Sequence, residues 1–163
     1  MFWEITKNTG GFTLIELVIV IIVIGILAAV AIPKFFSVTN EAETATVANM
    51  VSSLESAMSI YSARQYLRAQ SIEVHNPFDD LSNIPANYNG EVDPVDRDNT
   101  PDGTWSWRTG DNWIIYNPRS PITGGMVIDG ETYIAYQVQT VLDGTEVVGL
   151  RLTTTDLYEY DWQ

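Results

Sequence analysis

The chain opens, after a short leader, with an unbroken apolar segment. From Phe12 to Ile32 there are 21 residues with a single ionisable side chain, Glu16. At ~1.5 Å per helical residue, this segment reaches about 30 Å, the thickness of the hydrocarbon core of a bilayer. The pattern therefore predicts a leader at residues 1–11 and a membrane-spanning helix at residues 12–33.

Beyond the apolar segment, the apolar positions become periodic. Over residues 34–69 they recur at intervals of three or four, at Val47, Val51, Leu54, Met58 and Tyr61, with Ala48, Ala57 and Leu67 on or near the same face. Five polar residues are assigned to the solvent-facing side of this segment: Glu41, Glu43, Asn49, Ser53 and Glu55. This spacing predicts an amphipathic helix at residues 34–69. No strong stop signal separates it from the span, so one continuous helix is expected from about Thr13 to Ala69.

Residues 70–103 carry the proline, glycine and asparagine pairs that break helices, so they are expected to form a connecting loop with at most one short helical turn. Four carboxylates crowd this loop: Asp93, Asp96, Asp98 and Asp102. Their spacing lacks the glycine and glutamate of an EF-hand. A solvated acidic loop is the favoured interpretation, and a calcium site is the alternative.

Over residues 104–163 the apolar period becomes two, which is typical of strands. Strands are expected around Trp105 and Trp107, at residues 113–116, at 132–141 and at 157–162. The strand that returns after the Asp143-Gly144 turn is expected to face Val148, Leu150 and Leu152 inward. The predicted fold class is α+β: four or five antiparallel strands packed on the apolar stripe of one long amino-terminal helix.

Composition narrows the possible functions. With 8 Lys and Arg against 21 Asp and Glu, the formal charge is −13, which excludes sequence-independent binding to a nucleic-acid backbone. The chain has no cysteine and one histidine, His75, expected at the surface, so we predict no enzyme activity, no cofactor and no metal. Core packing is the favoured use of Trp105, Trp107 and Trp113, with carbohydrate stacking as the alternative.

The start of the apolar segment carries a specific motif. Gly11-Phe12-Thr13-Leu14-Ile15-Glu16-Leu17, followed by apolar residues up to Pro33, resembles the class III signal of type IV pilins and type II secretion pseudopilins. The resemblance implies cleavage by a prepilin peptidase between Gly11 and Phe12, methylation of the new amino terminus on Phe12, and retention of the helix. The absence of cysteine sets the chain apart from disulfide-bonded pilins.

Glu16 is costly within an apolar segment, by about 2.5–3.5 kcal/mol at mid-membrane. On the span alone, the side chain is expected to reach the membrane interface. With the resemblance, the favoured role is assembly, because after cleavage the carboxylate lies one turn from the Phe12 amine and can pair with that of a neighbouring subunit. Gly25 and Pro33 are the residues of the span with low helix propensity. The resemblance implies that they bound a stretch that loses helicity in filaments. The alternative is a membrane helix that accommodates both residues without losing its structure.

Three functions follow from these features. The first is a structural subunit of a type IV pilus; the second is a pseudopilin or minor pilin with an initiating or piston-like role in secretion; the third is a membrane-anchored module that binds a carbohydrate or protein. Short head motifs, among them Asn76-Pro77-Phe78, are similar to minor pilins of the mannose-sensitive haemagglutinin type. The implied partners are prepilin peptidase, other pilin subunits, the inner-membrane assembly platform and lipid. The implied location is the inner membrane, amino terminus in the cytoplasm and head outside, and then the filament.

Overall fold

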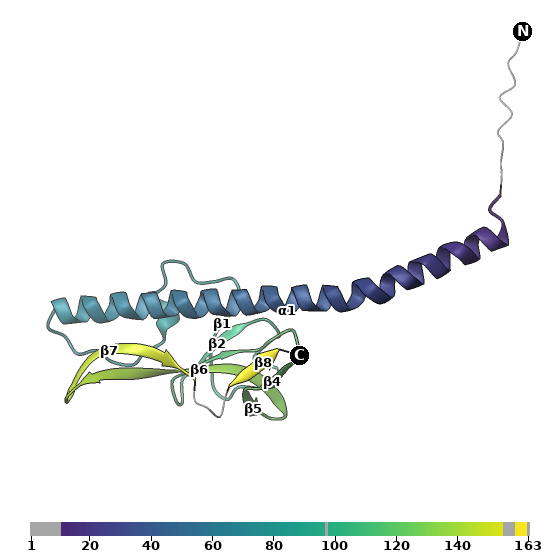
Figure 1. Ribbon diagram of the computed structural model, residues 1–163. Helices are drawn as coiled ribbons and strands as arrows, with labels where there is room; N and C mark the ends of the chain where they lie inside the picture. The colour runs from purple at the N-terminus through teal and green to yellow at the C-terminus, as the bar shows by residue number, and fades with distance from the viewer. Residues whose placement is uncertain (1–10, 97, 155–158, 163) are drawn as a thin grey trace, which may run out of the picture. The chain divides into compact units, whose positions relative to one another are not determined.

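The computed structural model describes residues 11–96, 98–154 and 159–162, and it divides into two compact units between Thr39 and Asn40. One helix, α1 (Leu14–Leu67), contributes to both units (Figure 1). All strands belong to the second unit, which we call the head. The α+β class expected from the sequence is confirmed.

Helix α1 begins and ends with recognisable capping chemistry. Thr13 is its N-cap, and Pro33 lies inside the helix. At the carboxyl end, Ala69 has a φ of 51°, its N–H donates to the carbonyl of Tyr66, and the N–H of Gln70 donates to that of Gln65. This pair of bonds is a Schellman motif, which stops the helix at Leu67, close to the predicted end at Ala69.

Hydroxyl side chains along α1 bond back to their own helix. Each donates to the carbonyl four residues earlier, and the set comprises Thr39, Thr44, Thr46, Ser53, Ser56, Ser59 and Ser62. These donors are therefore satisfied without water.

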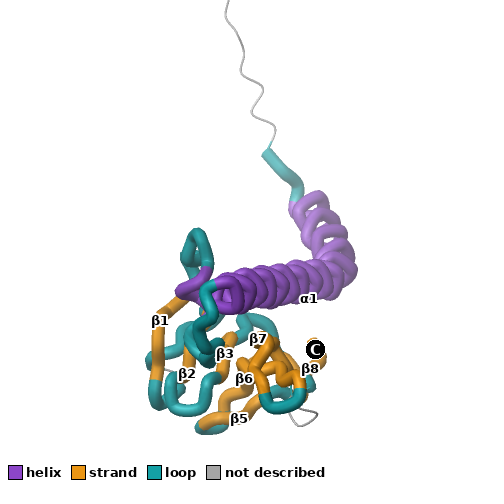
Figure 2. Tube along the Cα trace, turned by 90° about the vertical axis from the view of Figure 1, so that its left-hand side faces the viewer, coloured by secondary structure: helices purple, strands orange, loops and turns teal. Residues whose placement is uncertain are grey.

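The head contains one mixed sheet and one small two-stranded sheet. The strands are β1 (Tyr88–Val92), β2 (Trp105–Arg108), β3 (Trp113–Tyr116), β4 (Ile122–Gly124), β5 (Met126–Ile128), β6 (Glu131–Asp143), β7 (Glu146–Thr153) and β8 (Tyr160–Trp162). The larger sheet has the order β1-β2-β3-β6-β5, with β7 also paired to β6, and β4 pairs with β8. All pairings are antiparallel except that of β1 with β2. Figure 2 shows the strands gathered on one side of α1.

The interpretation of residues 70–103 as a connecting loop was partly wrong. The expected short helical turn is present as the 3-10 helix η1 (Pro77–Asp80), capped by the Asn76 side chain, which accepts from the N–H of Phe78 at 3.2 Å. The same stretch also supplies β1, an edge strand parallel to β2. No period-two pattern indicates this strand, because β1 carries Asn89-Gly90 at its centre. The predicted strand at 157–162 is present as β8, while residues 157 and 158 lie outside the described residues.

The large sheet is buried on both faces. One face packs on α1 through Leu54, Met58, Trp105, Trp107 and Ile114, and the other holds Trp113, Ile115 and Tyr133 with loop residue Val95. All three tryptophans are buried, so their predicted use in packing is confirmed and the carbohydrate-stacking alternative is wrong for them.

Three apolar residues expected on or near the inward face are exposed: Ala48, Leu67 and Val148. Leu67 is 85% exposed because helical spacing places it on the Ile60 side of α1, away from Ser62, which β7 approaches. Val148 is exposed because a β-bulge interrupts the β6–β7 ladder: Val141 pairs with Gly149 and Leu142 with Val147, which leaves Val148 as the extra residue. The bulge turns Val147 toward the core instead.

Glu43 was assigned to the wet side of the helix, and this was wrong. Its side chain is 8% exposed. Its carboxylate accepts hydrogen bonds from the Tyr116 hydroxyl at 2.8 Å, from the Arg119 N–H at 2.8 Å and from the Ser120 N–H at 3.2 Å. Glu43 thereby ties the loop between β3 and β4 to α1, a role that helical spacing alone does not indicate.

Candidate functional site

The predicted cleavage bond lies just outside the helix. Residues 11–13 have no regular structure, and α1 begins two residues after Phe12. A Cβ atom built on Gly11 would meet nothing within 4 Å, and Phe12 is 80% exposed. Among the described residues, none covers the Gly11–Phe12 peptide and none requires glycine at this position.

Thr13 and Glu16 form the first turn of the helix. The Glu16 N–H donates to the Thr13 hydroxyl oxygen at 3.3 Å, and the Leu17 N–H donates to the Thr13 carbonyl at 3.2 Å. A carboxylate in a first turn is favoured by the partial positive charge of the helix amino end. Thr13 was missed as a cap, although Thr-x-x-Glu before an apolar run is the signature of a capping box.

The rest of the segment is an apolar surface without cover in the single chain. Its large side chains are exposed from Phe12 to Val38, and α1 is long and apolar enough to cross a membrane. Gly25 and Pro33 both lie within the helix, and a Cβ atom on Gly25 would contact nothing. The implied loss of helicity concerns the assembled filament and stays a prediction.

The acidic loop organises its own backbone. Asp96 accepts from the N–H groups of Asp98 and Asn99, both at 2.9 Å, and Asp102 accepts from the Asn117 amide at 3.2 Å. Among the described residues, no group of three or more His, Cys, Asp or Glu side chains is placed to hold a metal ion. The calcium alternative gains no support there.

His75 is less exposed than the sequence suggested. Its Nε2 lies 2.6 Å from a carboxylate oxygen of Asp80, and its ring centroid lies 4.1 Å from that of Tyr61. These contacts fasten η1 to α1, which is a structural role.

Comparisons with known proteins agree with the motif. The family described as "Prokaryotic N-terminal methylation motif" matches residues 6–32. The chain is 50% identical over 50 residues to the type IV narrow pilus major component PilA5 of Thermus thermophilus, covering 31% of this chain and 43% of that protein. It is 49% identical over 51 residues to a fimbrial protein of Pseudomonas aeruginosa, covering 31% of this chain and 33% of that protein.

A secretion protein is also among the relatives. The chain is 29% identical over 89 residues to the type II secretion system core protein G of Escherichia coli, covering 53% of this chain and 61% of that protein. The chain thus spans about a third to three fifths of the length of these relatives. No solved structure matches the chain. The similarity to haemagglutinin-type minor pilins, which rested on short head motifs, stays a prediction. The methylation motif and these partial matches show that the chain is similar, over part of its length, to type IV pilins and to a type II secretion core protein.

Proposed function

We propose that the protein is a structural subunit of a type IV pilus or a type II secretion pseudopilus, assembled through its amino-terminal helix. The observation that carries this proposal is the first turn of α1, where an exposed cleavage motif is followed directly by an uncovered apolar helix with one carboxylate, Glu16. Such a surface requires lipid before assembly and other subunits afterwards.

Cleavage between Gly11 and Phe12 gives the helix a new cation. The Phe12 amine, methylated but still positively charged, lies four residues from Glu16 in the sequence. An unpaired carboxylate in an apolar filament core is strongly penalised, so Glu16 favours the position in which it meets the Phe12 amine of a neighbouring subunit. This pairing sets the axial register between subunits.

The same proposal gives the partners and the location. Prepilin peptidase processes the chain, the inner-membrane assembly platform receives it, and copies of the chain or related subunits surround it in the filament. Before assembly, the helix crosses the inner membrane with its amino end in the cytoplasm and its head outside. Enzymatic activity has no part in this role.

The first test is intact mass and amino-terminal sequencing of the protein from membranes of its native host. A start at methylated Phe12 is the expected result. An intact Met1, or cleavage beyond Pro33, would leave a plain signal anchor or a secreted domain and would refute the proposal.

The second test concerns Glu16. A Glu16→Ala chain is expected to be cleaved at the wild-type rate and to be lost from sheared filaments, because the change removes the partner of the Phe12 amine. Glu16→Asp, which keeps the charge on a shorter side chain, is expected to retain part of the assembly. Wild-type filament yield from Glu16→Ala would show that pairing is not the mechanism.

A further inference from the structure

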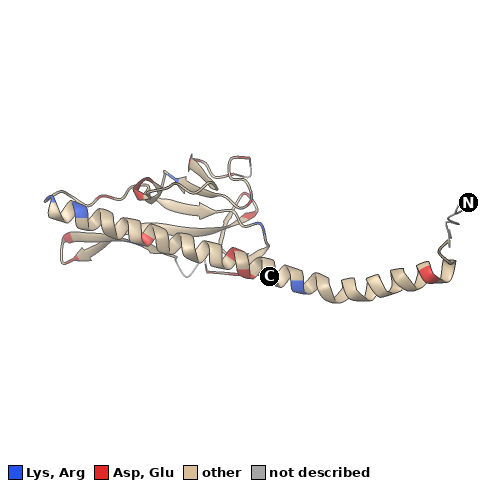
Figure 3. Cartoon of the chain, turned by 90° about the horizontal axis from the view of Figure 1, so that it is seen from above, with Lys and Arg blue, Asp and Glu red and all other residues tan. Residues whose placement is uncertain are grey.

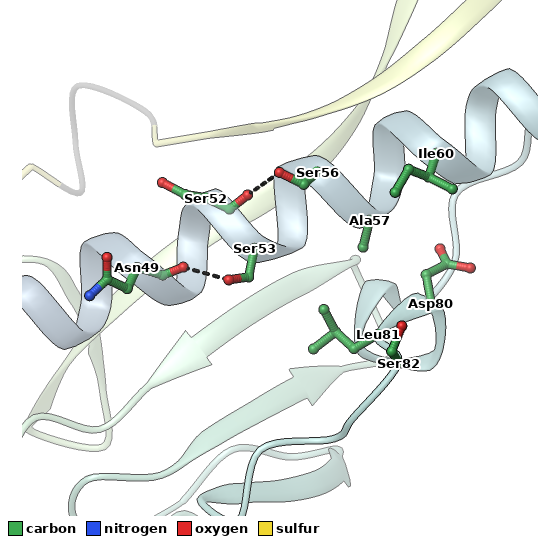
Figure 4. A pocket seen from close by; sticks show the side chains of 9 residues that line it. All are labelled: Asn49, Ser52, Ser53, Ser56, Ala57, Ile60, Asp80, Leu81 and Ser82. Atoms are coloured by element: carbon green, nitrogen blue, oxygen red, sulfur yellow. Dashed lines mark hydrogen bonds between the residues drawn. The ribbon is translucent and has the colours of Figure 1, made fainter.

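The outward face of α1 in the head forms one wall of an open groove. Asn49, Ser53, Ser56 and Ile60 line it from the helix, and Leu81 from the segment after η1 lies opposite (Figure 4). The groove has a volume of about 620 Å³. Its floor combines exposed Ile60 with hydroxyls that already donate to their own helix, so it suits a partly apolar occupant.

Beyond Ile60, the last residue of α1 that lines the groove, the same face of the helix carries basic and apolar residues. Helical spacing places Arg64 and Leu67 on the same face as Ile60, and Arg68 follows in the Schellman turn. Both arginines are exposed, and within the described residues no ion pair engages either of them. This is unusual in a head that bears the whole formal charge of −13, since Glu4 and Glu16 balance Lys7 and Lys34 elsewhere. We call residues 60–68 the basic helix end.

A second surface of the same head has the opposite charge. Beyond Gln137 the ladder with β3 ends, and β6 continues with β7 alone as a two-stranded arm (Figure 1). The tip of this arm presents Leu142, which is 58% exposed, together with exposed Asp143 and Glu146. Figure 3 shows the acidic tip and the basic helix end at the same end of the head. Among the described residues, neither acid of the tip is ion-paired.

Within one chain the arm and the groove lie on different sides of α1. The arm approaches α1 at Ser62, which is buried, and a Cβ atom on Gly149 of β7 would lie 4.0 Å from its hydroxyl oxygen. Ile60 and Ser62 are separated by about 200° around the helix axis. The arm of the same chain therefore packs on the side of α1 opposite the groove.

We propose that the arm tip of one copy docks on the basic helix end of a neighbouring copy, with Leu142 entering the end of the groove beside Ile60 and with Asp143 and Glu146 facing Arg64 and Arg68. Charge complementarity selects a second copy of this chain as the occupant, because each head carries both surfaces unsatisfied. The contact joins two different patches, so it is heterologous and repeats from subunit to subunit. It rests on the proposed function, since polymerisation is what brings heads side by side.

Disulfide trapping tests this contact directly, because the chain has no cysteine of its own. A full-length Leu67→Cys chain and a full-length Leu142→Cys chain are expressed together, and the filaments are collected and oxidised. A covalent dimer is expected from the mixture and not from either variant alone. The matched control replaces Leu142→Cys with Val127→Cys, an equally exposed apolar position on β5. Mixed filaments without dimer, or equal dimer with Val127→Cys, would overturn the contact.

Charge reversal gives an independent measurement. An Arg64→Glu/Arg68→Glu chain is expected to yield about tenfold fewer sheared filaments, and adding Asp143→Lys/Glu146→Lys to the same chain is expected to restore them. No loss in the first variant, or no recovery in the fourfold variant, counts against the contact. Cleavage at Gly11 is expected to be normal in every variant. Absence of both cleavage and filaments in the wild type would instead refute the proposed function.

Discussion

The buried carboxylate of Glu43 offers a sharp test of how the head is held to its helix. In Glu43→Ala, the Tyr116 hydroxyl and the Ser120 N–H, both in buried residues, lose their acceptor. A buried donor left unpaired costs about 1–3 kcal/mol, while the backbone N–H of Arg119, an exposed residue, can donate a hydrogen bond to water. With two such donors, the variant is therefore expected to lose about 2–6 kcal/mol of unfolding free energy.

Two substitutions that remove less of this contact are expected to lower the unfolding free energy by less. Glu43→Gln keeps one acceptor oxygen but sets an amide N–H against a donor, and about 1–3 kcal/mol is expected to be lost. Tyr116→Phe leaves the carboxylate with its two backbone donors, so the expected loss is about 1–2 kcal/mol. Glu55→Gln, on the exposed side of the same helix, is the matched control and should change stability by less than about 0.5 kcal/mol.

The assay is urea unfolding of the full chain in a mild non-ionic detergent, followed by the fluorescence of the buried tryptophans. If Glu43→Ala unfolds at the same urea concentration as Glu55→Gln, the three hydrogen bonds contribute nothing net, and the account of Glu43 as the anchor of the β3–β4 loop is refuted.

Three further predictions concern the head and the helix start. Burial, together with the hydrogen bond to Tyr160, raises the pKa of Tyr136 above its ordinary 10.0. The neutral phenol therefore stabilises the folded head fully below pH 10, and this stability is lost as the pH rises further. Tyr136→Phe should reduce that alkaline loss in unfolding measured against pH, and an unchanged profile would contradict it. Thr13→Ala removes the N-cap at a cost of about 1 kcal/mol, so hydrogen exchange of the Glu16 amide should accelerate about fivefold. An unchanged exchange rate would show that the Thr13 hydroxyl does not stabilise the first turn. Gly124 has a φ of 78° and directly faces the carbonyl of Glu159. Gly124→Ala should therefore unpair β4 from β8 and lower the free energy of unfolding by about 2 kcal/mol. An unfolding midpoint in urea equal to that of the wild type would exclude this packing.

The sequence allowed the helix and much of the sheet to be predicted for physical reasons. The apolar run after Phe12 and the three-to-four spacing from Val47 to Met58 are strong local patterns, and both lie in α1. The Asp143-Gly144 turn likewise predicted the β6–β7 hairpin, in which Gly144 has a φ of 63°. These features depend on neighbours close in the sequence.

The features that escaped prediction depend on partners distant in the sequence. Glu43 is buried because Tyr116 and the β3–β4 loop supply donors more than seventy positions away. Strand β1 exists because β2 offers it an edge, and Val148 turns outward because of a bulge in the ladder with β6. In the candidate site, the pairing role of Glu16 rests on the resemblance and stays a prediction. The Thr13 cap is an exception to the distant contacts, because it is local and the Thr-x-x-Glu spacing could have indicated it.

The hydroxyl side chains that bond back along α1 have a consequence for how one surface serves two environments. Burying a free hydroxyl costs free energy unless a partner replaces the lost water. On the helix face that lines the groove, Ser53 and Ser56 carry their hydrogen-bond partners with them. A neighbouring molecule can therefore exclude water from this face without leaving these two hydroxyl donors unpaired. In the proposed assembly, such a face is compatible both with water around a single head and with a close-packed contact to a neighbouring copy.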